Sequence, residues 1–187
     1  MTIEIDDSGT GDLVGNAFIG FLRKETGELI FRTLPLKLFK GEDWKNKVPL
    51  NVTVDLVKDG LKELKFQKNN EIIKLCRGNI FDEVRAYFVE KGINYEDAII
   101  EGKLQDAVEG KLVDYFRNEL GIRSKKLTKR SGAKRFFVLF NWVCYDFYNR
   151  EKYVKSGFKR WNSIWRDRAI DKYEKIKKNK RVRYNKY

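Results

Sequence analysis

The chain has 187 residues, of which 42% are hydrophobic and 14% aromatic, enough for one ordinary core or one core with an appended module. It contains no histidine, so catalysis by an imidazole base is excluded and carboxylates must carry any acid–base or metal chemistry. The net charge of +13 lies at one end: residues 1–124 carry 19 basic and 22 acidic side chains, whereas residues 125–187 carry 21 and 5. Such asymmetry is typical of a near-neutral domain with a basic arm for a polyanion.

The first 122 residues alternate between strand-like and helix-like patterns. Runs rich in Ile, Phe, Leu and Thr, separated by glycine-containing breaks, predict an antiparallel meander of three strands at residues 2–7, 16–23 and 28–39. Apolar spacing then predicts a helix, strand, helix, strand and helix at residues 51–65, 71–76, 80–91, 97–101 and 103–120. This order predicts an α/β fold with a mixed sheet, in which two parallel strands extend the meander through crossover helices.

The last third of the chain predicts a basic helical region. Residues 123–135 form a basic connection, which we interpret as the boundary between a domain at 1–122 and an extension at 123–187. Two aromatic-rich helices are expected in this extension, one starting at Phe136 and one running from about Phe158 to Lys178.

Aromatic side chains interleaved with Lys and Arg in this extension are typical of nucleic-acid binding, because cations neutralise phosphates and rings stack on exposed bases. The basic residues that we expect to contact nucleic acid are Lys125, Lys126, Lys129, Arg130, Lys134, Arg135, Arg160 and Arg166. Two other interpretations stay open: an ordinary helical core with a solvated basic face, or a basic amphipathic helix on an anionic membrane surface.

A short N-terminal segment combines adjacent acids with closely spaced glycines. Asp6-Asp7-Ser8-Gly9-Thr10-Gly11, followed by Gly15, resembles the D-E-A-G-R-G-x-x-x-G segment that opens type 2 ribonucleases H, with Thr10 in place of the arginine. The resemblance implies that Asp6 and Asp7 are metal-binding catalytic acids. It also implies that Gly9, Thr10 and Gly11 contact the ribose of a nucleic acid. The predicted element order is that of the ribonuclease H-like fold, so we expect the chain to belong to that wider superfamily.

Nucleases of this superfamily bring carboxylates from the first strand, a later strand and the following helix around two magnesium ions. We therefore expect Mg²⁺ or Mn²⁺ as cofactor, held by catalytic residues Asp6, Asp7, Glu101 and Asp106, with Glu109 as an alternative to Asp106. Cys76-Arg77-Gly78-Asn79 resembles the family segment that ends the fourth strand, with Arg77 in place of the acid. An arginine cannot bind a metal but can clamp a phosphate, so Arg77 joins the expected nucleic-acid contacts.

Three functions stay open from the sequence. The first is a metal-dependent nuclease acting on RNA, DNA or RNA–DNA hybrid, the second a non-catalytic nucleic-acid-binding protein, and the third a peripheral membrane or assembly protein. Cys76 and Cys144 lie in apolar runs, which indicates buried thiols in a reducing compartment. We expect no signal peptide and no transmembrane segment, since the most apolar stretch, Phe136 to Tyr148, is short and interrupted by polar residues. These observations predict a cytoplasmic protein.

Overall fold

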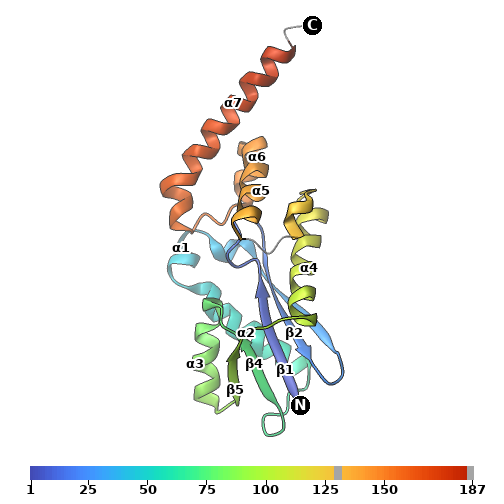
Figure 1. Ribbon diagram of the computed structural model, residues 1–187. Helices are drawn as coiled ribbons and strands as arrows, with labels where there is room; N and C mark the ends of the chain where they lie inside the picture. Colours follow the sequence, from blue (N-terminus) through green and yellow to red (C-terminus); the bar gives the residue numbers. More distant parts are fainter. Residues whose placement is uncertain (129–131, 185–187) are drawn as a thin grey trace.

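A five-stranded mixed sheet forms the centre of the structure, a computed structural model that describes residues 1–128 and 132–184 (Figure 1). The strands are β1 (Thr2–Ser8), β2 (Ala17–Arg23), β3 (Leu29–Leu34), β4 (Ile72–Cys76) and β5 (Tyr95–Ala98), and they lie in the order β3-β2-β1-β4-β5. β2 is antiparallel to both of its neighbours, whereas β1, β4 and β5 are parallel. The prediction of an α/β fold with a mixed sheet is confirmed.

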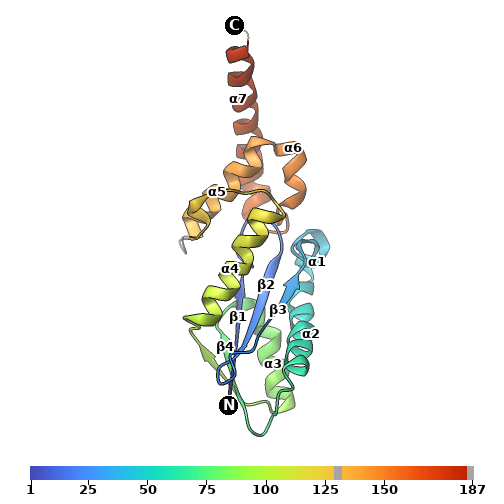
Figure 2. The same ribbon diagram turned by 90° about the vertical axis from the view of Figure 1, so that its right-hand side faces the viewer.

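Helices cover both faces of the sheet (Figure 2). α2 (Val48–Glu63) and α3 (Asp82–Lys91) lie on one face, where they enclose a core with inward residues of the strands such as Ile5 and Phe21. α4 (Lys103–Asn118) lies on the opposite face and contacts β1 and β2. With both faces covered, every residue of β2 is buried, as expected for a central strand of a two-sided sheet.

In the first 122 residues, three element boundaries differ from the predicted ones by three residues or more. β3 ends at Leu34 rather than at 39, because Pro35 has no N–H for the ladder and leads into a 3₁₀ turn. α2 starts at Val48 rather than at 51, with Pro49 in the first turn, where a missing N–H costs nothing. β5 covers Tyr95–Ala98 rather than 97–101, because its partner β4 ends at Cys76, which pairs with Ala98.

The C-terminal third is mainly helical in the described residues. It contains α5 (Gly132–Tyr145), α6 (Phe147–Arg150), a π-helical segment (Trp161–Trp165) and α7 (Arg166–Tyr184), which extends away from the rest of the molecule (Figures 1 and 2). The non-helical residues 154–158 contact α1 (Gly41–Lys45) through its Trp44. None of the helices described combines the length and the apolar character needed to cross a membrane.

The C-terminal helices share an apolar core with the N-terminal part of the chain. Leu13 and Phe18 belong to the same buried cluster as Leu139, Phe147 and Trp161. A single antiparallel bridge also joins Val14 to Val154. Packing is therefore continuous across the boundary expected after residue 122, and the division into two domains stays a prediction.

Candidate carboxylate site

Three side chains that could ligate a cation meet at the ends of β1 and β4. Asp6 and Asp7 lie near the end of β1, and Cys76 is the last residue of β4. The parallel register pairs Ile5 with Leu75, which brings these two strand ends side by side. Ligand atoms of Asp6, Asp7 and Cys76 lie within 4.8 Å of one another. The carboxyl ends of parallel strands are the usual place for a site in an open α/β sheet.

Asp6 is buried, with 5% of its surface exposed, and the Cys76 thiol hydrogen-bonds to its carboxylate. Burial raises the pKa of Asp6, the hydrogen bond from Cys76 acts in the opposite direction, and Glu109 and Glu4 raise it further. Burial, together with the hydrogen bond to Asp6, raises the pKa of the Cys76 thiol to about 12. The thiol is therefore protonated at neutral pH and acts as a donor to Asp6 rather than as a thiolate ligand.

Asp7 is half-buried, and its Oδ2 accepts a hydrogen bond of 2.6 Å from the Thr10 hydroxyl. Burial raises the pKa of Asp7 to about 6; Asp6 acts in the same direction, whereas Thr10 and Lys155 lower it. The loop after β4 reaches the carboxylate closely, since a Cβ at Gly78 would lie 2.9 Å from Asp7 Oδ1. Two adjacent carboxylates with raised pKa values fit a hard divalent cation. The charge of the cation would stabilise the ionised form of both carboxylates, which burial disfavours.

The glycine segment after β1 is fixed by a lysine from the C-terminal region. Gly9 has a φ of +89°, and a Cβ there would lie 2.9 Å from Leu112, so the turn requires glycine. Lys155 is fully buried, and its ammonium donates a hydrogen bond to the Gly9 carbonyl and lies 4.4 Å from the centre of the Phe39 ring. Burial lowers the pKa of Lys155 to about 7, against the opposing effects of Asp12 and Asp7.

An arginine connects the glycine segment to α4. Arg135 Nε donates to Asp12 Oδ1 at 2.9 Å, and Arg135 Nη1 donates to Glu109 Oε2 at 2.5 Å. The other oxygen of Glu109 accepts a 2.8 Å hydrogen bond from the Ser8 hydroxyl. Glu109 is therefore the acid of α4 that contacts β1, and its charge is already paired with a guanidinium.

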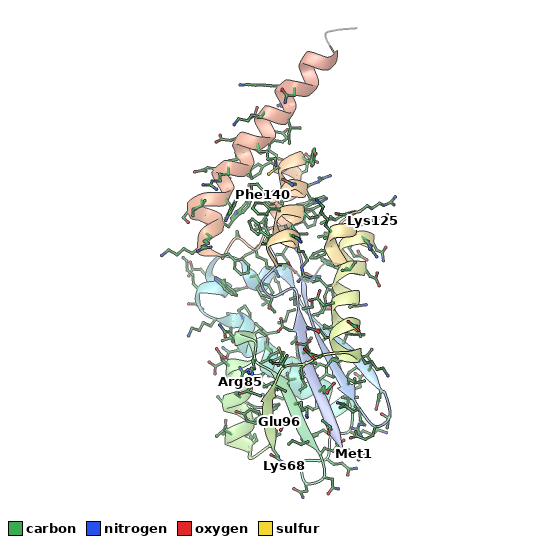
Figure 3. The ribbon with its side chains drawn as sticks, viewed as in Figure 1. Met1, Lys68, Arg85, Glu96, Lys125 and Phe140 are labelled. Atoms are coloured by element: carbon green, nitrogen blue, oxygen red, sulfur yellow. The ribbon has the colours of Figure 1, made fainter. Side chains whose placement is uncertain are left out.

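A second arginine holds the end of β4. Arg85, labelled in Figure 3 beside β4 and β5, donates to the carbonyls of Cys76 at 2.8 Å and Gly78 at 3.3 Å. Its Nε donates to Asp97 at 2.7 Å, and its Nη1 lies 3.0 Å from Asp82. One side chain thus joins the end of β4, the following loop, α3 and β5.

The structure brings together only part of the predicted acidic set. Asp6 and Asp7 lie in the group described above, whereas Glu101 is exposed in the connection between β5 and α4, and Asp106 is exposed on α4. Neither residue belongs to that group. Glu101 lies three residues beyond the end of β5, and Asp106 lies almost one helical turn before Glu109, the acid of α4 that contacts β1. Their role as metal ligands stays a prediction. Arg77 is exposed directly after β4.

The predicted nucleic-acid contacts in the glycine segment line two cavities. One of about 500 Å³ is bounded by Asp7, Gly9, Glu109 and Arg135, and one of about 920 Å³ by Trp44, Asn79 and Phe158. Thr10 and Gly11 line both cavities, so the glycine segment separates them. The glycine segment therefore has open space on both of its sides, and Asp7 lines the smaller cavity.

The predicted basic contacts differ in their surroundings. Lys126, Lys134 and Arg160 are exposed, and Lys125 is exposed beyond the end of α4 (Figure 3). Arg135 is half-buried between Asp12 and Glu109, and Arg166 pairs with Glu151 at 2.5 Å. Lys129 and Arg130 lie outside the described residues.

Sequence reasoning missed four residues of this region. Asp12 carried a weak signal, as a third acid within the glycine segment, and Cys76 was interpreted only as a buried thiol. Lys155 and Arg85 carried no local signal, because their partners are distant in sequence.

Comparison with known proteins does not assign the chain. No protein-family model matches it, and none of the curated proteins gives a match. Functional inference therefore depends on the geometry described above.

Proposed function

We propose that the chain has a ribonuclease H-like fold and acts as a metal-dependent nuclease on RNA, DNA or an RNA–DNA hybrid. One observation carries this proposal: Asp6 and Asp7 lie at the end of the central strand β1, beside the end of the parallel strand β4. The resemblance to type 2 ribonucleases H predicts catalytic acids at these two residues. The sheet order β3-β2-β1-β4-β5, with crossovers through α2 and α3, supports the same fold.

In this proposal Asp6 and Asp7 hold the divalent cation, Mg²⁺ or Mn²⁺, since hard cations prefer carboxylate oxygens. When bound, such a cation activates water and stabilises the leaving oxygen of a phosphodiester. The chain's own groups orient the ligands: the Cys76 thiol hydrogen-bonds to Asp6, and the Thr10 hydroxyl donates to Asp7. Lys155 fixes the glycine turn that follows. These contacts limit the rotation of both carboxylates before any ligand binds.

Exposed cations around the site support a polyanionic substrate. Lys45 and Lys47 line the larger cavity beside the glycine segment, and Lys126 and Lys134 are exposed before and at the start of α5. Residues 125–187 as a whole carry an excess of 16 positive charges over 63 residues. Phosphates that pair with such cations release counterions, which makes binding salt-dependent.

Cleavage of labelled RNA, DNA and hybrid substrates in Mg²⁺ or Mn²⁺ tests the proposal. Asp6→Asn/Asp7→Asn should abolish metal-dependent cleavage. The matched control Asp55→Asn/Asp59→Asn removes the same charge from the exposed face of α2 and should leave cleavage unchanged. Cleavage that survives the first double variant would contradict the catalytic role of these acids.

A second candidate is a nucleic-acid-binding protein without catalysis. Glu109 is already paired with Arg135, and Arg77 stands where the resemblance places an acid, so carboxylates for a second cation are fewer than in the family pattern. This candidate predicts salt-sensitive binding that survives Asp6→Asn/Asp7→Asn, with no substrate cleaved by the unchanged protein.

A further inference from the structure

An aromatic cavity of about 600 Å³ lies next to the carboxylate site. Five aromatic side chains form most of its wall: Trp44, Phe136, Phe158, Trp161 and Trp165. Two cations, Lys159 and Arg160, also line it. Its volume is within the range of pockets that hold small organic ligands.

The cavity is continuous with the surroundings of the proposed catalytic acids. Phe136 lines both this cavity and the one bounded by Asp7 and Glu109. Trp44 and Phe158 line both this cavity and the larger one that reaches Thr10 and Gly11. A strand with a phosphate near Asp7 could therefore place a neighbouring base among these rings.

The rings are held in place but are not fully covered. Trp44, Phe136, Phe158 and Trp165 are all half-buried, unlike the fully buried aromatic residues of the main core. Edge-to-face contacts fix them, with ring centres 5.1 Å apart for Trp44 and Phe158 and 4.8 Å apart for Phe136 and Trp165. Half-covered, pre-positioned rings are suited to stacking on a flat ligand.

A buried hydrogen-bond donor at this cavity favours a nucleobase over a purely apolar ligand. Trp161 is 1% exposed, and its Nε1–H has no hydrogen-bond partner among the described residues. An unpaired buried donor is costly, so a ligand that offers an acceptor here would gain more than an aliphatic chain. Nucleobases offer carbonyl oxygens and ring nitrogens as acceptors.

The two cations at this cavity match the charge of a nucleotide. Lys159 and Arg160 are both exposed, and neither forms an ion pair with any residue that the structure describes. Their positive charges are therefore available to the phosphates on either side of a base.

We propose that this cavity takes an unstacked nucleobase, so that the substrate is a single strand or contains unpaired nucleotides. The inference rests on the proposed action on nucleic acid and narrows its substrate class. A base inside a duplex has both faces stacked and must be unstacked and unpaired, at a cost in free energy, before it can enter the cavity. An unpaired base enters at a lower cost, which gives single strands the advantage.

Binding in the presence of EDTA tests the inference separately from cleavage. The probes are a fluorescein-labelled DNA strand of about 12 nucleotides, a span typical of single-strand sites, the same strand with abasic sites, and its fully paired duplex. The full-length protein should bind the intact strand about tenfold more tightly than the abasic strand, since stacking and one hydrogen bond are lost without bases. The duplex should also bind more weakly than the intact strand.

Two variants identify the cavity as the source of this preference. Trp161→Phe removes the N–H and keeps an aromatic ring, and Trp165→Leu removes a ring and keeps an apolar side chain. Each should weaken binding of the intact strand at least threefold, as expected for part of a stacking contact, without changing binding of the abasic strand. Trp142→Phe is the matched control, because Trp142 lies against Tyr153 and Arg150 outside this cavity.

The outcomes separate this inference from the proposed nuclease activity. Equal binding of intact and abasic strands, or a preference for duplex, overturns the inference even if Asp6 and Asp7 support cleavage. A base preference that depends on Trp161 upholds it even if no substrate is cleaved. If Trp165→Leu fails to fold by circular dichroism, Trp161→Phe decides. Failure to bind any of the probes overturns the inference, whereas the nuclease proposal is decided by the cleavage test of Asp6 and Asp7.

Discussion

The fully buried ammonium of Lys155 donates a hydrogen bond to the carbonyl of Gly9, which joins two segments 146 residues apart in sequence. The lysine comes from the C-terminal helical region, and the glycine follows the two acids of β1. The charge of Lys155 also acts to lower the pKa of Asp7 and, after the larger effect of Arg135, that of Asp12. The C-terminal region therefore contributes directly to the geometry and the charge of the carboxylate site.

Because the pKa of Lys155 is lowered in the folded state, we expect the stability of the protein to rise with pH above neutrality. Burial lowers the pKa of Lys155 to about 7 in the folded state, so between pH 7 and 9 the unfolded chain binds more protons at this residue. The free energy of unfolding should rise over this range with a slope of up to about 1.4 kcal/mol per pH unit. In urea unfolding, Lys155→Met should flatten this slope, while the exposed Lys178→Met should retain it. An unchanged slope in Lys155→Met would contradict the assignment.

Because the pKa of Asp7 is raised in the folded state, we expect the stability of the protein to fall as the pH rises in the acidic range. Burial raises the pKa of Asp7 from 3.8 to about 6, so between these values the folded state binds more protons and loses stability as the pH rises. In EDTA at pH 7, Asp7→Asn should therefore be more stable than the unchanged protein by about 3 kcal/mol. The gain should vanish below about pH 4. Urea unfolding at both pH values checks this, and the exposed Asp55→Asn should show no such gain at pH 7.

The sequence predicted the parts of this site that depend on local pattern. The acids and glycines of residues 6–11 are adjacent in the chain, so their place at a strand end followed from spacing alone. The order of strands and helices followed from apolar periodicity in the same way. Cys76 lies in the site because the parallel register pairs Ile5 with Leu75. The register between two strands that are distant in the chain cannot be read from the local sequence of either strand.

The rotation of α4 about its axis explains why Glu109, rather than Asp106, contacts β1. Asp106 and Glu109 are three residues apart on α4, and both match the expectation of an acid early in that helix. The packing of Leu104, Val108 and Leu112 against the sheet fixes the rotation of α4, and with this rotation Glu109 reaches Ser8. Periodicity gives the buried stripe but not which flanking acid contacts a neighbouring strand.

Arg85 predicts a link between the end of β4 and cation binding. Arg85→Met removes the donors to the Cys76 and Gly78 carbonyls and the partner of Asp97, so it should lower the free energy of unfolding by about 1–2 kcal/mol. The loop beside Asp7 loosens as a result, and Mn²⁺ should bind severalfold more weakly in a calorimetric titration. Arg85→Lys should recover only part of both losses, because an ammonium lacks the planar fork of a guanidinium. Full recovery by lysine would show that charge alone matters.

Gly78 predicts a selective loss of cation binding without loss of the fold. Its φ of −59° is accessible to alanine, but a Cβ would lie 2.9 Å from Asp7 Oδ1 and push the carboxylate out of position. Gly78→Ala should weaken Mn²⁺ binding by about tenfold, the scale seen when groups that orient metal ligands are altered. The matched control is Gly110→Ala on α4, where a Cβ meets nothing within 4 Å and alanine favours the helix. If both variants bind Mn²⁺ as the unchanged protein does, Asp7 is not a ligand, because a displaced ligand must alter the affinity.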